Sequence, residues 1–167
     1  ELEADITETI VIDPAETETT AKKFTKDDKY NVKLSANVYR HNNDQGKWAV
    51  VVHPFMLNGK IMANSVGKMY YEQGFNVIAP DLRGFGSSDG SVALGFLESL
   101  DVYDWLVELD KKYEPKEVIV HGVSLGAATT NFLSGIDEFL QNEKAPVKMT
   151  GIKSLKDDLH VIGLVED

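Results

Sequence analysis

The stretch VIVHGVSLGAATT, from Val118 to Thr130, joins a short apolar run to a segment of small residues with helical spacing. An apolar run of this kind is typical of a strand that is covered on both faces. At the junction stands Gly122-Val123-Ser124-Leu125-Gly126, which has the G-x-S-x-G pattern. That pattern places a serine on a sharp turn between a strand and a helix.

The two glycines of this pattern have a steric purpose. A nucleophile on so tight a turn requires small residues two positions before and two after it, and Gly122 and Gly126 fill those positions. We therefore predict a strained backbone at Ser124. Its hydroxyl would stand exposed at the amino end of a helix, where the dipole favours negative charge. The alternative is a glycine-rich turn with an incidental serine.

A serine nucleophile also needs two backbone N–H donors to hold the oxyanion of the tetrahedral intermediate. One donor is expected from Leu125, the residue after the serine. The other is expected from the loop after the strand WAVVV, where His53-Pro54-Phe55 follows. Pro54 has no N–H, so we expect the donor to be Phe55, or Met56 if the loop is offset. For the His53 side chain we favour a structural role that pins the loop.

A third strand end carries DLRGFGSSDG, from Asp81 to Gly90. A dinucleotide-binding loop would read G-x-G-x-x-G and open directly into a helix. The last glycine has the wrong spacing, and the next helical pattern begins several residues later. We therefore interpret this loop as a wall of the pocket, in which Asp81 and Arg83 bond to nearby backbone.

Strand and helix patterns alternate from Lys47 onward with short connections. This alternation predicts an α/β fold with a predominantly parallel sheet and helices on both faces. Before it, Val32–Arg40 alternates as a half-buried strand, and a turn cluster follows at Asn42–Gly46. We expect Val32–Arg40 and the strand Trp48–Val52 to form an antiparallel hairpin at the amino end. Residues 1–21 form an acidic, Thr- and Glu-rich arm or an edge strand.

The three strand-end segments, in this order, resemble the α/β-hydrolase family. HPF stands where members usually have His-Gly and an aromatic residue, DLRGFGSSDG matches the family's D-x-R-G-x-G-x-S-x-G segment, and HGVSLGAAT matches its nucleophile elbow. The resemblance covers residues 22–167 and is strongest to bacterial serine hydrolases labelled serine aminopeptidase-like. It implies a Ser–His–acid triad and a covalent acyl-enzyme. The implied activity is that of a carboxylesterase-type hydrolase acting on a small acyl substrate, an ester or else an amide or thioester.

The remaining triad members are not evident in the sequence. Family order is serine, acid, histidine, and His160 is the only histidine after Ser124. His160 opens the strand pattern His160–Val165 and so would lie at the amino end of the strands. Ser124 would lie at their carboxyl end, about 20 Å away. We therefore expect the acid and histidine to lie outside this chain, which would be the amino-terminal portion of a hydrolase domain and inactive alone.

Composition narrows the classes of partner. The 167 residues carry 17 basic and 27 acidic side chains, a formal net charge of −10, which argues against binding to nucleic acid. There is no cysteine, no apolar run long enough to span a membrane, and no motif for a cofactor or metal. Residue 1 is Glu, so cellular location stays open. The apolar strand His160–Val165 suggests self-association through a sheet edge, and a non-catalytic binding or assembly module is the alternative function.

Overall fold

The computed structural model describes residues 6–141 and 159–164 of the chain. The strands are β1 (Ile6–Ile12), β2 (Leu34–Tyr39), β3 (Lys47–Val52), β4 (Asn76–Pro80), β5 (Glu117–Val123) and β6 (Leu159–Leu164). The helical segments are α1 (Thr20–Thr25), η2 (Asp28–Tyr30), α2 (Gly59–Met62), η3 (Ala63–Gly67), α3 (Lys68–Tyr71), α4 (Phe96–Tyr113) and α5 (Leu125–Gln141). The segment η2 is a 3₁₀ turn, and η3 is a π-helical stretch between α2 and α3.

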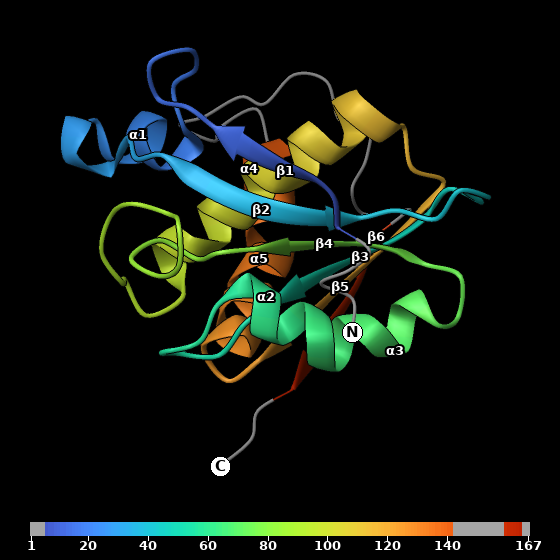
Figure 1. Cartoon of the computed structure of the whole chain (residues 1–167). Coiled ribbons are helices and arrows are strands. Elements are labelled where there is room, and N and C mark those ends of the chain that lie inside the picture. Colours follow the sequence, from blue (N-terminus) through green and yellow to red (C-terminus); the bar gives the residue numbers. More distant parts are fainter. Residues whose placement is uncertain (1–5, 142–158, 165–167) are drawn as a thin grey trace.

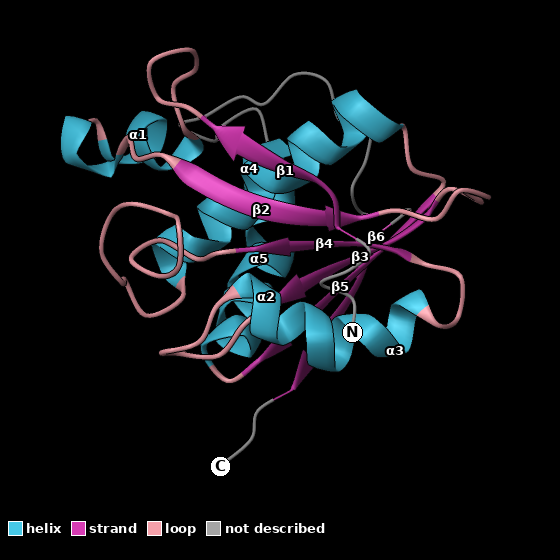
Figure 2. Ribbon diagram, viewed as in Figure 1, coloured by secondary structure: helices cyan, strands magenta, loops and turns pink. Residues whose placement is uncertain are grey.

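The strands form one six-stranded sheet in the order β1-β2-β4-β3-β5-β6. The four strands β4, β3, β5 and β6 are mutually parallel, whereas β2 runs antiparallel to β4 and β1 antiparallel to β2. Figure 1 shows the sheet crossing the molecule with helices on either side, and Figure 2 separates the strands from the helices by colour. The predicted α/β class with a predominantly parallel sheet is confirmed.

The prediction of a hairpin between β2 and β3 is wrong in its pairing. The antiparallel pair at the amino end is β1 with β2, and β4 lies between β2 and β3. The connection after β2 is long enough to span the width of β4. It is tied to that strand through Asp44, whose carboxylate accepts hydrogen bonds from Gly46 N at 2.7 Å and from Asn76 Nδ2 at 2.8 Å. The turn cluster therefore bridges over β4 instead of closing a two-stranded ladder.

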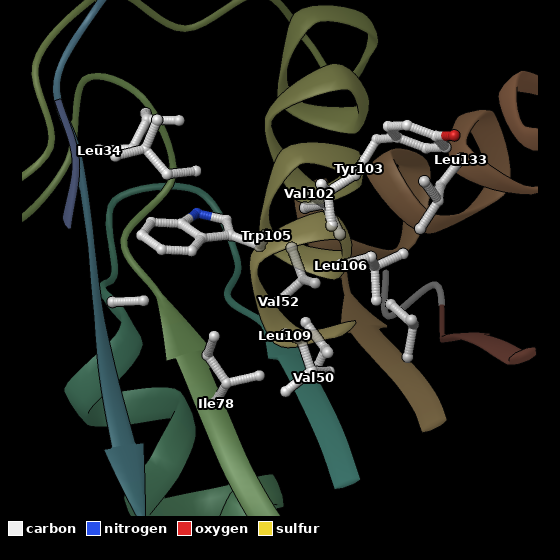
Figure 3. Packing of buried hydrophobic residues seen from close by; sticks show 14 of the residues in the cluster. Leu34, Val50, Val52, Ile78, Val102, Tyr103, Trp105, Leu106, Leu109 and Leu133 are labelled. Atoms are coloured by element: carbon white, nitrogen blue, oxygen red, sulfur yellow. The ribbon is translucent and has the colours of Figure 1, made fainter. Parts of the chain in front are cut away.

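Strand β3 shows why both faces of the sheet need a helical cover. Trp48, Val50 and Val52 point into the core between the sheet and the helices α1, α4 and α5. Figure 3 shows Val52 near Trp105 and Leu106, and Val50 near Leu109. Ala49 and Val51 alternate to the other face, under α2 and α3. Successive side chains of a strand point to opposite faces, so a continuous apolar strand is stable only between two layers of helices.

Candidate active site

The turn between β5 and α5 holds Ser124 in a strained conformation. Its φ is 56°, in the left-handed region that an L-residue other than glycine rarely adopts. The Ser124 carbonyl accepts the first helical hydrogen bond of α5, from Ala128 N at 3.0 Å. The side chain is exposed and makes no hydrogen bond to residues 6–141. The serine thus stands free at the amino end of a 17-residue helix, where a developing negative charge is favoured.

Close backbone contacts fix this turn. A Cβ on Gly122 would lie 2.1 Å from the carbonyl oxygen of Gly126, and one on Gly126 would lie 2.0 Å from the carbonyl oxygen of Val52. Real Cβ atoms do not approach oxygen so closely, because of van der Waals repulsion. The two glycines therefore allow β5, α5 and the end of β3 to meet at the serine.

The loop after β3 forms a turn beside the serine. Leu57 N donates to Pro54 O at 3.3 Å, and Met56 lies at φ 65°. Neither Phe55 N–H nor Leu125 N–H donates a hydrogen bond to the described part of the chain. Ser124, Phe55 and Leu125 line one open cleft of about 420 Å³. Its other lining residues are Leu94, Ala128 and Asn131. The structure therefore brings the predicted serine and both predicted donor residues to one surface hollow.

His53 is buried and holds two loops together. Leu82 N–H donates to its Nε2 at 2.9 Å, so Nε2 carries no proton and the Nδ1–H donates to Pro54 O at 2.7 Å. Burial lowers the pKa of this imidazole, which agrees with a neutral ring whose two nitrogens are both engaged. The side chain is structural, as the sequence analysis favours, and it joins the loop after β3 to the loop after β4.

The loop Asp81–Gly90 after β4 is held by its own polar groups. The Asp81 carboxylate accepts from Gly59 N at 2.8 Å and from Ser87 N at 2.9 Å, as predicted. The expectation for Arg83 is wrong in its main partner. Its guanidinium forms a bidentate pair with Asp101, with Nε 2.6 Å from one carboxylate oxygen and a terminal nitrogen 2.7 Å from the other. A buried guanidinium needs a counter-charge, and only a weaker contact at 3.5 Å goes to Tyr30 O.

Helix α4 supplies three buried carboxylates that sequence reasoning missed, namely Glu98, Asp101 and Asp104. Glu98 accepts hydrogen bonds from the N–H groups of Ala93 and Gly95 at 2.9 and 3.2 Å. Asp104 accepts from Thr20 N at 2.9 Å and from the Thr20 hydroxyl. Burial raises the pKa of Asp101 to about 7, against the opposing effect of Arg83, and that of Asp104 to about 6. The sequence signal for this cluster was the spacing of three residues, which places the three carboxylates on one face of the helix among apolar neighbours.

The other histidines have partners or places away from the serine. His121 Nδ1 lies 2.8 Å from the Tyr70 hydroxyl, and burial lowers its pKa. The His41 ring stacks on the Tyr71 ring, and its Nε2 lies 2.9 Å from the Tyr71 carbonyl oxygen. The backbone of His160 is in register with Ile119, five residues before Ser124 along β5. Within residues 6–141, no hydrogen bond joins Ser124 to a histidine.

The part of the chain that the structure describes holds neither a metal-binding cluster nor a membrane-spanning helix. No three His, Asp or Glu side chains there are grouped so as to hold a metal ion. None of the helices there combines the length and the apolar character needed to cross a membrane. The predicted arm or edge strand at residues 1–21 includes β1, which lies at one edge of the sheet and contributes Ile10 and Ile12 to the core.

The sequence model of the family described as alpha/beta hydrolase fold matches residues 50–137, from the middle of β3 through most of α5. The chain belongs to this family. Two curated relatives of this chain are multifunctional-autoprocessing repeats-in-toxin proteins. The one from Vibrio cholerae is 30% identical over 87 residues and the one from Vibrio vulnificus 31% identical over 83 residues. The matches cover 51% and 48% of this chain, and the chain spans only 2% of the length of either relative.

Solved structures show the same fold. The Pyrococcus furiosus esterase Pf2001 superposes with a TM-score of 0.59 and 24% identity over 83% of this chain and 48% of that one. An alpha-beta serine hydrolase homologue from Coxiella burnetii superposes with a TM-score of 0.59 and 13% identity, over 96% of this chain and 88% of the other. At identities this low, the superpositions show a shared fold alone.

Proposed function

We propose that Ser124 is the nucleophile of a serine hydrolase that cleaves carboxylic esters, of the carboxylesterase type. The observation that carries this proposal is the exposed serine at φ 56° in a cleft also lined by two residues with unengaged N–H groups. Strain of this kind persists where the surrounding structure imposes it and is concentrated at functional sites. Esterase and serine hydrolase structures of the same fold support the reaction class.

In the proposed reaction, Ser124 Oγ bonds to the ester carbonyl carbon while its proton passes to a base. The carbonyl oxygen becomes an oxyanion and is held by the N–H groups of Phe55 and Leu125. Each such donor contributes about 3–4 kcal/mol to transition-state stabilisation. The C–O bond to the alcohol then breaks, the alcohol takes the proton, and water releases the acid from the acyl-serine in a second, equivalent cycle.

The base is proposed to be a histidine, oriented by an acid, from a part of the protein outside these 167 residues. The engaged rings of His53 and His41 and the position of His160 in β6 support this assignment. Without a base the serine hydroxyl is a weak nucleophile at neutral pH. The isolated chain is therefore expected to show ester hydrolysis near background.

The test is labelling of the full-length protein and of the 167-residue chain with a fluorophosphonate, followed by peptide mapping by mass spectrometry. We expect the label on Ser124 in the full-length protein, and Ser124→Ala to lower the rate of aryl ester hydrolysis at least about 10³-fold. Ser134→Ala is the matched control, because Ser134 is exposed on the same helix and bonds only its own helical backbone.

Two results would contradict the proposal. One is undiminished hydrolysis by Ser124→Ala, which would remove Ser124 as the nucleophile. The other is a folded full-length protein that neither labels nor hydrolyses esters, which would favour the non-catalytic binding or assembly module.

A further inference from the structure

Exposed apolar side chains gather around the Ser124 cleft. Phe55 is 52% exposed and Leu94 is 79% exposed, and both line the cleft. Phe132, also exposed, lies against the loop that carries Leu94, and its ring meets that of Phe96 edge to face with centroids 6.0 Å apart. An apolar group of this kind, next to an unengaged polar group, is typical of a surface that binds an apolar ligand.

Leu94 is the most exposed of these residues, and its backbone is held in a strained conformation. Its φ is 52°, in the left-handed region. The residues on either side of it donate their N–H groups to one buried carboxylate, that of Glu98. A Cβ on the following residue, Gly95, would lie 3.3 Å from Ala128 Cβ and 3.2 Å from the Phe132 ring, so the loop rests directly on α5. A strained backbone that presents a leucine to solvent adds nothing evident to the core, which points to function.

Four of the six residues that line the cleft come from the start of α5 and the turn before it, namely Ser124, Leu125, Ala128 and Asn131, and the other two are Phe55 and Leu94. Ser124 and Asn131 are seven residues apart, which corresponds to about 10 Å along a helix. A straight hydrocarbon chain of about this length, with its reacting carbonyl at Ser124, would lie along Ala128 and the apolar side chains that line the cleft.

We propose that Leu94 is the specificity-determining residue of this cleft: it packs against the hydrocarbon chain of the ester and sets the preferred chain length. The inference rests on the proposed function of Ser124 for its kinetic test, and its binding test is independent of hydrolysis. Each methylene group moved from water onto an apolar surface is worth roughly twofold to fourfold in affinity. Glu98 holds the loop that carries Leu94, through the N–H groups of Ala93 and Gly95.

The kinetic test uses the full-length protein and two ester series, p-nitrophenyl esters from acetate to decanoate and alkyl acetates from ethyl to octyl. Leu94→Asn removes the apolar surface at similar size, and Asn accepts the left-handed conformation. Leu94→Met keeps the apolar surface. Met69→Ala is the control, because Met69 is an exposed apolar residue of α3, under the other face of the sheet.

We expect Leu94→Asn to lower kcat/KM about tenfold or more for the longest esters of one series, mainly through KM, and to change the acetate ester less than about twofold. Leu94→Met and Met69→Ala should keep the wild-type chain-length profile. The series in which kcat/KM no longer rises with chain length shows whether the acyl or the alcohol chain lies on Leu94. An unchanged profile in both series for Leu94→Asn would overturn the inference while leaving Ser124 as nucleophile.

The binding test uses calorimetry with N-methyloctanamide and N-methylacetamide on the Ser124→Ala variant, with and without Leu94→Asn. We expect the long amide to bind more tightly than the short one, and Leu94→Asn to remove most of that difference. Equal binding with and without Leu94→Asn would overturn the inference. Binding that depends on Leu94, together with a wild-type protein that shows no esterase activity, would support the inference and refute the proposed function.

Discussion

Two loops leave the same edge of the sheet and use their polar residues in opposite ways. The turn after β5 leaves the Ser124 side chain exposed and without a hydrogen bond to residues 6–141. The loop after β4 uses its charged residues internally, with Asp81 bound to two backbone N–H groups and Arg83 buried against Asp101. Both loops are glycine-rich, but the sequence predicts a nucleophile only in the first and a structural wall of the pocket in the second. The contrast separates a group available for chemistry from groups that hold the scaffold.

The largest expected effect comes from breaking the first loop. Gly126→Ala would place a methyl group 2.0 Å from the carbonyl oxygen of Val52, so the backbone must move. We expect a loss of about 5 kcal/mol or more in the free energy of unfolding, measured by urea denaturation. Gly135→Ala on the same helix meets no atom within 4 Å and should stabilise by about 0.5–1 kcal/mol. Similar effects of the two substitutions would show that the turn is not sterically fixed.

The next effect comes from breaking the second loop. Arg83 and Asp101 are only 1% and 2% exposed in their side chains, and removing one partner leaves an uncompensated buried charge. We expect Arg83→Met to destabilise the fold by about 3–5 kcal/mol. Lys68→Met, at the exposed Lys68–Glu72 pair, should cost less than about 1 kcal/mol. A loss below about 1 kcal/mol for Arg83→Met would mean that the pair does not hold the loop.

The smallest effect concerns the histidine that joins the loops after β3 and β4. Burial lowers the pKa of His53 in the folded state, so below about pH 6.5 the unfolded chain binds more protons at this residue than the folded one. Its contribution to stability is therefore present at neutral pH and lost as the pH falls. We expect the pH slope of the unfolding free energy between pH 7 and 5 to be reduced in His53→Gln, by at most about 1.4 kcal/mol per pH unit.

His121 and other groups titrate in both proteins, so only the difference between wild type and His53→Gln is informative. Parallel slopes in the two proteins would show that the imidazole does not hold the loops in its neutral form.

The features predicted from sequence are those fixed by local sterics. Gly122 and Gly126 specify the turn at Ser124, and Pro54 narrows the choice of donor in the neighbouring loop, because each argument involves only a few adjacent residues. The pairing of β2 could not be derived in this way. Nothing near Val32–Arg40 indicates that a strand some forty residues later will insert beside it. Strand order depends on the path of the crossover helix, which is a long-range property.

The buried acids of α4 were missed for a different reason. Glu98, Asp101 and Asp104 look like the solvated side of an amphipathic helix, and acidic residues are almost never fully buried unless paired. Their partners are an arginine 18 residues before Asp101, the N–H groups of the loop before α4, and the first residue of α1. Their spacing of three residues places the carboxylates on one face of the helix, but composition and periodicity do not encode such partners and so do not show that this face is buried.

The same three carboxylates make α4 a common anchor for parts of the chain that are distant in sequence. Glu98 holds the N–H groups of Ala93 and Gly95, Asp101 holds the loop after β4, and Asp104 holds the N–H of Thr20 at the start of α1. None of these segments can detach singly without leaving a buried carboxyl group without its hydrogen-bond partners. In native-state hydrogen exchange they would therefore belong to one cooperative unit with α4, opening together or not at all.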